Sequence, residues 1–211
     1  MRPLLTSLEI RRAELRDMGH LSRLCRSGFP WTAKWGFAPP FILKWWWRGA
    51  LSSDTCEAWV ATEKDRVIGF YVLVTDLRQW RYERLHRRGS LLVRAFLLLC
   101  RPRTWMFAAR QRFKQVRHKT RDKRDVRQEA AWLDWMSVDP PFRGLGVGKK
   151  LLDHCEHRCR ENDRSVLRLD VYKRNRKAQK FYVCSGYHFE GETGQVRKYG
   201  KRLSEATTVG L

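Results

Sequence analysis

Long uncharged segments are absent from this sequence of 211 residues. No uncharged run exceeds nine residues, the length of 35–43 and of 67–75, whereas a membrane-spanning helix needs about 20 mostly apolar residues. The first residues, MRPLLTSLEIRR, lack the apolar core of a secretory signal. Glycine (14 residues) and proline (7 residues) are too few for a collagen-like or low-complexity chain. We therefore predict a cytoplasmic protein with a folded core, for which 43% apolar residues are sufficient.

Acidic residues are also scarce. The chain has 22 Asp and Glu against 44 Lys and Arg, which gives a formal net charge of +22. The imbalance is concentrated in residues 78–128, where 17 basic and three acidic residues give a net charge of +14. A field of this size attracts phosphate-rich partners. Nucleic acid, an anionic membrane surface and a polyanionic substrate are therefore all candidate partners.

Hydrophobic patterning predicts a mixture of strands and helices. β-Branched or alternating runs indicate strands, and apolar stripes at helical spacing indicate helices. The expected strands are 7–11, 57–61, 67–75, 130–138, 166–171, 187–190 and 196–202, and the expected helices are 14–28, 41–51, 146–162 and 174–185. A loop is expected at 29–40 and basic helices at 78–128. We expect one α+β domain over 1–211, with a mixed central sheet flanked by helices.

The six cysteines do not form the pattern of a disulfide framework or a metal site. They are Cys25, Cys56, Cys100, Cys155, Cys159 and Cys184. In a cytoplasmic chain they are expected to be reduced. Cys155 and Cys159 lie among histidines, but they continue a four-residue spacing with Val147 and Leu151, which is the apolar face of a helix. We therefore expect buried thiols and no metal.

The segment 138–152, VDPPFRGLGVGKKLL, carries the clearest chemical signal. A predicted strand ends, a Pro-Pro turn follows, and the run RGLGVG (143–148) leads into an amphipathic helix. Glycines allow close approach of the backbone to a ligand, and N–H groups at a helix N-terminus bind anions. Lys149 and Lys150 add positive charge. The pattern predicts a site for a pyrophosphate.

Two common glycine motifs are excluded by spacing. A P-loop requires Gly at position 143, where this chain has Arg, and Ser or Thr after Lys149, where it has Lys150. A dinucleotide-binding motif requires Gly three residues after Gly146, where Lys149 stands. Taken alone, the glycine run is equally well explained as a tight turn that caps a helix.

Two motifs together resemble a known family. Arg143-x-x-Gly146-x-Gly148, between a strand and a helix, resembles the coenzyme A motif of the GCN5-related N-acetyltransferases, the GNAT superfamily. The later segment 175–187, NRKAQKFYVCSGY, is similar to the second signature of that family: Asn, Ala three residues on, a Phe-Tyr pair, then Gly and an aromatic residue. The resemblance covers 130–202 closely and 7–76 loosely. Residues 78–128 match no part of it and are expected as a basic helical insertion between the third and fourth strands.

The resemblance implies acetyl-CoA as co-substrate and no metal. In this family the strand before the glycine turn splays from the next parallel strand, and pantetheine pairs with its backbone, here between 135–138 and 169–171. The pyrophosphate then lies on the turn, Asn175 touches the coenzyme, and Lys177 lies near the 3′-phosphate. The implied coenzyme-binding residues are Met136, Val138, Arg143, Gly144, Leu145, Gly146, Val147, Gly148, Lys149, Asn175 and Lys177.

The resemblance also implies direct attack of an amine on the thioester. An alkylammonium of pKa about 10 must first lose a proton, so a base is needed, and the departing thiolate gains from an acid. Tyr182 stands where the family commonly has that acid. Asp134 and Asp170 are the candidate bases, and Asp134 is preferred because strand parity places it on the face of Met136 and Val138. Packing for Tyr182 and ion pairing for the carboxylates are the structural alternatives.

The acceptor and the role of the basic segment stay open in the sequence. Family members choose their acceptor through the first helices and their loop, here 29–47. Phe29-Pro30, Gly36 and Phe41 resemble a subgroup found with bacterial surface-polysaccharide pathways, which implies an amino sugar. Residues 78–128 are explained by helices on an anionic membrane face, by binding of nucleic acid, or by a solvated lid, and the apolar run 91–99 favours membrane over nucleic acid. An RNA-linked or protein amine as acceptor, and a CoA-binding protein without catalysis, are the alternatives.

Overall fold

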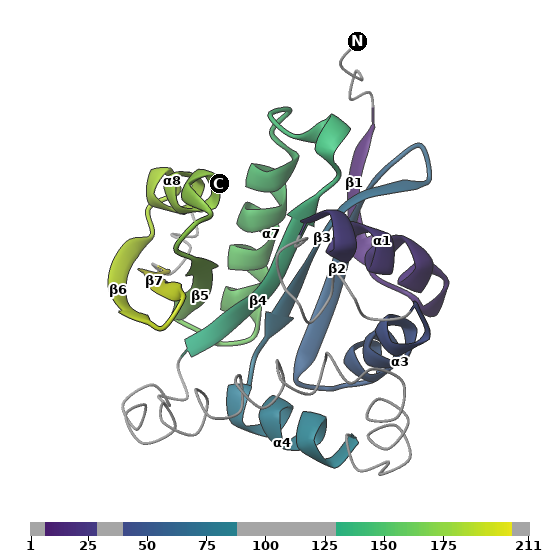
Figure 1. Cartoon of the computed structure of the whole chain (residues 1–211), viewed down its shortest axis with the longest axis horizontal. Coiled ribbons are helices and arrows are strands. Elements are labelled where there is room, and N and C mark those ends of the chain that lie inside the picture. The colour runs from purple at the N-terminus through teal and green to yellow at the C-terminus, as the bar shows by residue number, and fades with distance from the viewer. Residues whose placement is uncertain (1–6, 29–39, 88–129, 204–211) are drawn as a thin grey trace, which may run out of the picture.

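A computed structural model describes residues 7–28, 40–87 and 130–203. Its centre is a seven-stranded sheet in the order β1-β2-β3-β4-β5-β7-β6 (Figure 1). Neighbouring strands are antiparallel except β4 and β5, which are parallel. The strands are β1 (Leu8–Arg12), β2 (Cys56–Glu63), β3 (Arg66–Val74), β4 (Ala130–Val138), β5 (Val166–Tyr172), β6 (His188–Thr193) and β7 (Val196–Arg202). The predicted α+β fold with a mixed, mostly antiparallel sheet is confirmed.

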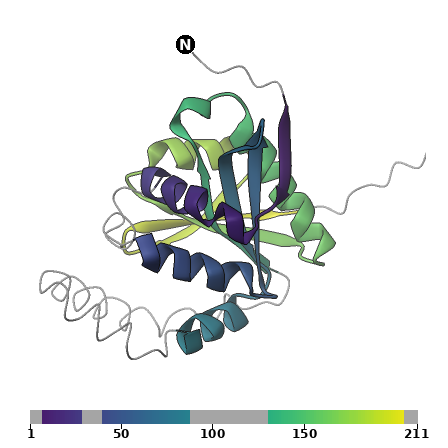
Figure 2. The same ribbon diagram turned by 90° about the vertical axis from the view of Figure 1, so that its right-hand side faces the viewer.

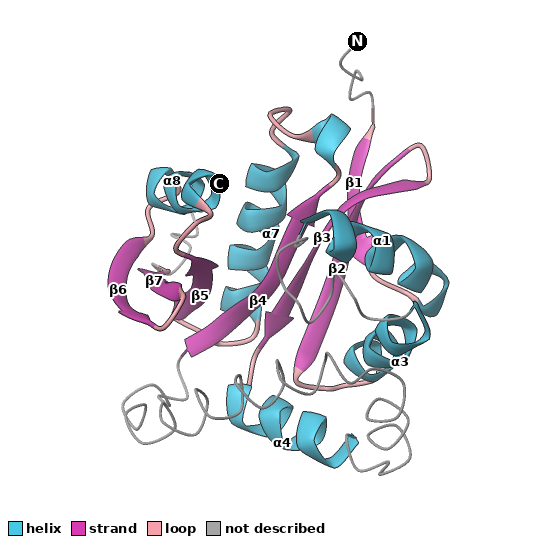
Figure 3. Ribbon diagram, in the orientation of Figure 1, coloured by secondary structure: helices cyan, strands magenta, loops and turns pink. Residues whose placement is uncertain are grey.

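Helices cover both faces of this sheet (Figures 2 and 3). Two helices, α1 (Met18–Gly28) and α3 (Pro40–Leu51), pack on one face, and α1 follows a 3₁₀ turn (Leu15–Asp17). On the other face α7 (Val147–Glu161) crosses β3 and β4, and α8 (Arg176–Cys184) packs into the same apolar cluster. The helix α4 (Leu77–Arg87) follows β3. All four helices predicted outside the basic segment are therefore present.

The central strand β3 explains why the sheet needs cover on both faces. Its residues VIGFYVLV (67–74) are all buried. Ile68, Tyr71 and Leu73 belong to the cluster under α7, whereas Phe70 and Val72 belong to the cluster under α1 and α3. A strand that is buried on both faces has a continuous apolar sequence rather than an alternating one. The sequence of β3 has this continuous pattern.

The cysteines of α7 lie in the core, as predicted. Cys155 and Cys159 are completely buried in the cluster that also contains Val147 and Leu151. Burial raises the pKa of Cys155 well above its ordinary value, so it remains a neutral thiol. The neighbouring His157 points outward with an exposed side chain. Within 7–28, 40–87 and 130–203 no group of three metal-ligating side chains is found.

The basic segment lies between the third and fourth strands. β3 ends at Val74 and β4 begins at Ala130. Of the helices expected in 78–128, α4 is described, and 88–129 fall outside the described residues. The carboxylate of Asp76 caps α4 by accepting the N–H groups of Arg78 and Gln79 at 2.8 and 2.9 Å. The loop expected at 29–40 also falls outside, apart from Pro40, which begins α3. None of the described helices is long and apolar enough to cross a membrane.

Candidate active site

The strands β4 and β5 separate at the centre of the sheet. Their parallel pairing ends at Leu133 opposite Leu169. Beyond these residues β4 continues against β3, and β5 continues against β7. The divergence was predicted between 135–138 and 169–171. The structure places its start directly after Leu133 and Leu169, so Leu169 itself is still paired.

Beyond this point the backbone of β4 presents polar groups toward β5. The N–H of Asp139 donates to the carbonyl of Ile68 at 2.7 Å, which makes these two residues a hydrogen-bonded pair of the β3–β4 ladder. Hydrogen-bonded and non-hydrogen-bonded pairs alternate along an antiparallel ladder. Met136 and Val138 therefore turn their N–H and C=O groups away from β3, to the side from which β5 has separated. An extended ligand can pair with these groups.

A β-bulge interrupts β4 at Asp134. Val72 of β3 lies opposite Trp135, and the next residue, Leu73, lies opposite Leu133. Asp134 is therefore the extra residue of the bulge. Trp135 packs toward α1 and α3, and Leu133, Met136 and Val138 pack toward α7. Simple alternation would place Leu133 and Trp135 on one face. The bulge breaks the alternation on which the parity argument for Asp134 depended, so parity does not decide its face and the preference for Asp134 stays a prediction.

Asp134 and Asp170 stand at the same level on the two separating strands. Leu133 and Leu169 are the last paired residues of β4 and β5, and each aspartate directly follows one of them. Asp134 is half-buried and its Oδ2 atom is buried, whereas Asp170 is exposed. The pKa of Tyr172 is raised by burial and also by the charge of Asp170. Two carboxylates thus flank the start of the divergence, and Asp134 is the more shielded of the two.

The glycine turn has an open, left-handed backbone. A short 3₁₀ turn (Pro140–Phe142) leads into it from β4. Gly144 and Gly146 have φ angles of +79° and +82°, a region that L-residues rarely adopt. A Cβ atom added at either glycine would meet no atom within 4 Å. These glycines are therefore required by the backbone conformation rather than by packing, and the surface above both of them is open.

The N-terminus of α7 follows this turn directly. The first intrahelical bond joins the N–H of Lys150 to the carbonyl of Gly146 at 3.0 Å, so the N–H groups of 147–149 have no acceptor within the helix. Three such groups at a helix N-terminus form an anion site. The ammonium group of Lys149 pairs with Asp153, one turn along α7. The group of Lys149 that faces no partner within the helix is therefore its backbone N–H, while its ammonium group is paired.

The other residues of the turn hold it against β4 and α8. Arg143 is exposed, and its Nε donates to the carbonyl of Val138 at 2.9 Å. Leu145 is half-buried against the core under α7. A Cβ added at Gly148 would lie 3.8 Å from Cζ of Phe181 and 3.9 Å from Cγ2 of Val138. The end of β4, the start of α7 and the middle of α8 therefore meet at Gly148.

The residues predicted on α8 differ in their surroundings. Asn175 caps the helix, because its Oδ1 accepts the N–H of Ala178 at 3.2 Å. Lys177 is exposed. Tyr182 is buried, and its ring makes an edge contact with Phe181 at a centroid distance of 5.1 Å. Burial raises the pKa of Tyr182 above its ordinary value, so its hydroxyl carries a proton throughout the neutral range.

A buried polar group behind Tyr182 was missed in the sequence. The ring of Tyr187 packs edge-on against Tyr182 at 5.7 Å, and its hydroxyl donates to Glu156 Oε1 at 3.1 Å. Glu156 is buried on α7 and also accepts Lys201 Nζ at 2.8 Å. The same ammonium group donates to the carbonyl of Ser185 at 3.1 Å. This group joins the C-terminal end of α8 to α7.

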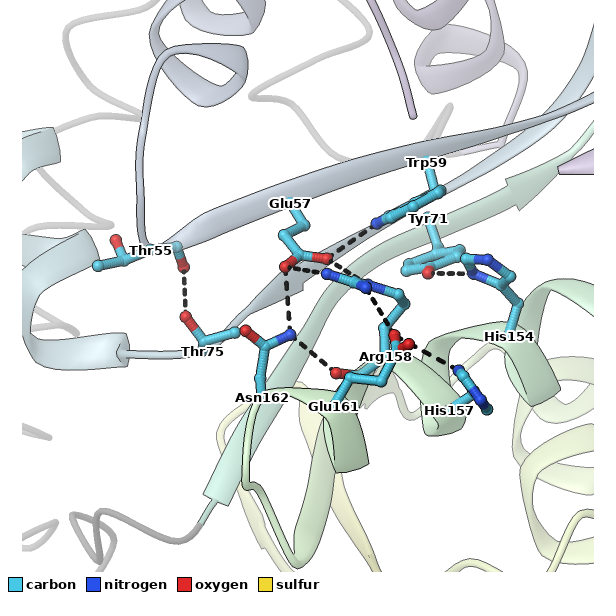
Figure 4. A network of polar contacts seen from close by, with 10 residues as sticks. All are labelled: Thr55, Glu57, Trp59, Tyr71, Thr75, His154, His157, Arg158, Glu161 and Asn162. Atoms are coloured by element: carbon cyan, nitrogen blue, oxygen red, sulfur yellow. Dashed lines mark hydrogen bonds and ion pairs between the residues drawn. The ribbon is translucent and has the colours of Figure 1, made fainter. Parts of the chain in front are cut away.

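A second polar network, also missed, fixes the far end of α7 to the sheet (Figure 4). Arg158 donates to both carboxylate oxygens of Glu57, at 2.9 and 3.0 Å. Trp59 and Asn162 donate to the same carboxylate at 3.0 and 3.1 Å. Burial alone would raise the pKa of Glu57, but these hydrogen bonds outweigh it and hold the pKa below its ordinary value. The network anchors α7 on β2.

The face opposite α7 is covered by α1 and by tryptophans. A Cβ added at Gly28 would collide with the hydroxyl of Ser137, so the end of α1 lies close to β4. Trp46 of α3 stacks on Trp135 of β4, with centroids 4.7 Å apart and planes at 14°. Of the acceptor region predicted at 29–47, residues 40–47 are described, and Trp46 brings this region against β4.

The comparisons with known proteins identify the family and the fold of this chain. Residues 18–187 match the model of the family described as "Acetyltransferase (GNAT) family". A search of curated proteins found no significant match.

Solved structures with the same fold include several acetyltransferases. The PaiA N-acetyltransferase of Thermoplasma acidophilum, solved in complex with coenzyme A, is 17% identical, covers 93% of this chain and 99% of its own, and has a TM-score of 0.56. An acetyltransferase of Thermus thermophilus is 13% identical, covers 96% and 100%, and has a TM-score of 0.62. A GNAT-family acetyltransferase of Staphylococcus aureus is 17% identical, covers 94% and 100%, and has a TM-score of 0.59. At these identities the likeness shows the fold, and the family match over most of the chain shows that it belongs to the GNAT family of acetyl-CoA-dependent acetyltransferases.

Proposed function

We propose that this protein transfers an acetyl group from acetyl-CoA directly to a primary amine, and that the acceptor is an amino sugar. One observation carries the proposal: β4 separates from β5 after Leu133, and the rest of β4 then leads to the open glycine turn and the N-terminus of α7. Strand backbone that faces away from β3 and a phosphate-binding turn thus lie in sequence along one path. A pantetheine arm with its pyrophosphate has the same order of groups.

The residues along this path fit acetyl-CoA, which supplies the activated acetyl group. The backbone of Met136 and Val138 pairs with the pantetheine amides, because these strand groups face the side that β5 has left. The N–H groups of 147–149 bind the pyrophosphate. Asn175 and the exposed Lys177 lie one helix further on, and we assign them to the coenzyme and its 3′-phosphate.

The transfer requires a base and an acid. An alkylammonium of pKa about 10 is protonated at neutral pH and must lose its proton before it attacks. We assign this step to the carboxylate pair at the start of the divergence, with the more shielded Asp134 preferred over Asp170. We assign the proton that the departing sulfur receives to Tyr182, which stays protonated because burial raises its pKa.

The acceptor class rests on a different observation. The stacked pair Trp46 and Trp135 lies on the sheet face opposite α7, beside the level of Asp134. Broad aromatic rings pack well against the C–H faces of a sugar, whose hydroxyl and amino groups then point outward. This half-buried aromatic pair supports the amino sugar over a small aliphatic amine. An RNA-linked or protein amine is the competing acceptor.

Calorimetric titration of acetyl-CoA, with free CoA and ATP as controls, tests the coenzyme site. ATP is needed because a protein of net charge +22 attracts any polyphosphate. Saturable 1:1 binding of acetyl-CoA, with ATP much weaker, would support the site. Equal binding of ATP would overturn it.

An acceptor screen then tests catalysis, by mass spectrometry of the acetylated product and by the thiol released. Amino sugars, lysine peptides, aminoacyl-tRNA and polyamines are compared at equal concentration. Turnover highest with an amino sugar would support the acceptor class. Turnover confined to a peptide or RNA-linked amine would overturn that class but keep the transferase. Binding of acetyl-CoA without turnover on any amine would overturn the catalytic assignment and indicate a CoA-binding protein.

A further inference from the structure

The outward surface of α3 and α4 combines positive charge with exposed aromatic rings. Trp45 on α3 is 41% exposed and Tyr82 on α4 is 62% exposed. Basic side chains flank both of them and are also exposed. We call this set the α3–α4 surface; its members are Lys44, Trp45, Arg48, Arg78, Arg81 and Tyr82.

The two helices are joined by tryptophans on their inner sides. Trp47 of α3 and Trp80 of α4 are buried, and Trp46 contacts Trp80 edge-on with centroids 6.3 Å apart. Figures 1 and 2 show both helices at the same end of the sheet. The inner tryptophans pack in the core, whereas Trp45 and Tyr82 expose much of their rings to solvent.

Among the described side chains of α3 and α4 there is no exposed carboxylate, and the exposed Asp76 precedes α4. The sequence of α3 contains no acidic residue. In α4 the acidic residue Glu83 is half-buried and accepts the hydroxyl of Ser53 at 2.7 Å. Asp76 lies just before α4 and serves as its cap. The surface is therefore complementary in charge to an extended anionic partner.

We propose that the α3–α4 surface binds the face of an anionic lipid bilayer. Lys and Arg are attracted by acidic headgroups. Trp and Tyr settle at the headgroup level, because each has an apolar body and one polar edge. The two helices, joined through Trp46 and Trp80, carry these groups on their outer sides, which suits headgroups better than the groove in which single-stranded bases stack. This inference does not depend on acetyl transfer.

The test is co-sedimentation of the full chain with vesicles of phosphatidylcholine alone or mixed with phosphatidylglycerol. We expect binding to the mixed vesicles only. Removing one basic residue from a membrane surface weakens binding about fivefold. The pair Arg78→Gln and Arg81→Gln should therefore weaken it about 25-fold. The pair Trp45→Ala and Tyr82→Ala should weaken it at unchanged net charge.

The matched control is the pair Lys180→Gln and Arg202→Gln. Both residues are exposed; Lys180 lies on α8 and Arg202 at the end of β7. The two control substitutions remove the same amount of charge as the α4 pair. We expect the control to bind the mixed vesicles within about twofold of the unmodified chain, since distant surface charges are screened. Thermal unfolding shows that each variant is folded.

Three results would overturn the proposal. The control pair could weaken binding as much as the α4 pair, which would mean that net charge alone attracts the protein. The variant lacking both aromatic side chains could bind as well as the unmodified chain. Finally, a homopolymer RNA could bind more tightly than the vesicles and be weakened by the same substitutions, which would assign the surface to nucleic acid.

Discussion

The left-handed backbone at Gly146 leads to a prediction that links stability to coenzyme binding. A Cβ added there would touch nothing within 4 Å, so Gly146→Ala introduces no collision. Its effect comes from the φ angle of +82°, which costs an L-residue about 1–2 kcal/mol. In a domain of this size 1 kcal/mol lowers Tm by about 2–4 °C. We therefore expect Gly146→Ala to lower Tm by about 2–8 °C without ligand.

The same substitution should weaken the anion site. If the backbone relaxes to a negative φ, the N–H groups of 147–149 no longer converge, and acetyl-CoA loses part of its pyrophosphate contacts. A loss of binding free energy comparable to this backbone strain corresponds to a rise in Kd of about tenfold. Gly146→Glu should abolish binding, because its carboxylate would stand against the pyrophosphate.

Gly19→Ala is the matched control. Gly19 lies in α1, its added Cβ would also meet nothing within 4 Å, and its φ is not positive. Alanine there should leave Kd unchanged and raise stability by up to about 1 kcal/mol. Thermal unfolding and calorimetry measure both quantities. If Gly146→Ala melts and binds like the unmodified protein, the turn does not depend on its left-handed backbone and the reasoning is refuted.

Tyr182→Phe should lower kcat far more than it raises KM for acetyl-CoA in steady-state kinetics, and an unchanged kcat would remove Tyr182 from the role of acid. Glu57→Gln leaves the half-buried Arg158 with the more exposed Glu161 as its remaining carboxylate partner and should lower the free energy of unfolding in urea by about 2–3 kcal/mol; a loss under about 0.5 kcal/mol would show that solvent screens the pair. The pKa of Glu57 is held low in the folded state. Its contribution to the free energy of unfolding is therefore complete above about pH 4.3 and is lost as the pH falls through the lowered pKa of the folded state. Burial, with Arg158 and His157, lowers the pKa of His154, so stability should already begin to fall below about pH 6.5. The urea midpoint should then decline in two stages on acidification, and the upper stage should persist in Glu57→Gln but vanish in His154→Gln.

Local patterns predicted most of the fold and part of the site. The strand β4 begins and ends at the predicted residues, 130 and 138, because a β-rich run is bounded there by a charged segment and a Pro-Pro turn. The glycine turn was recognised because RGLGVG stands between a predicted strand and an amphipathic helix and, together with 175–187, resembles a GNAT motif. The bulge at Asp134 was not predictable, since WLDW contains neither glycine nor proline and bulges are set by the neighbouring strand.

The polar groups around α7 were missed for a different reason. Glu57 and Arg158 are 101 residues apart in the chain, and Glu156 and Lys201 are 45 apart. In a chain with 44 basic residues, each carboxylate has many plausible partners. Only the packing of α7 across the sheet decides which pairs form. Periodicity identified the apolar face of this helix, but not the long-range pairs on its flanks.

The two ends of α7 carry different tasks, and the distance between them makes these tasks separable. The N–H groups at Val147 face the glycine turn, and Arg158 binds Glu57 on β2. A rise of 1.5 Å per residue puts these positions about 16 Å apart along the axis. Glu57→Gln should therefore lower stability while leaving the Kd for acetyl-CoA unchanged. Acetyl-CoA binds only the folded state. At 100 times Kd it should therefore add about 2.7 kcal/mol to the free energy of unfolding of this variant and of the unmodified protein alike. A smaller gain in Glu57→Gln would mean that the far end of α7 also shapes the turn.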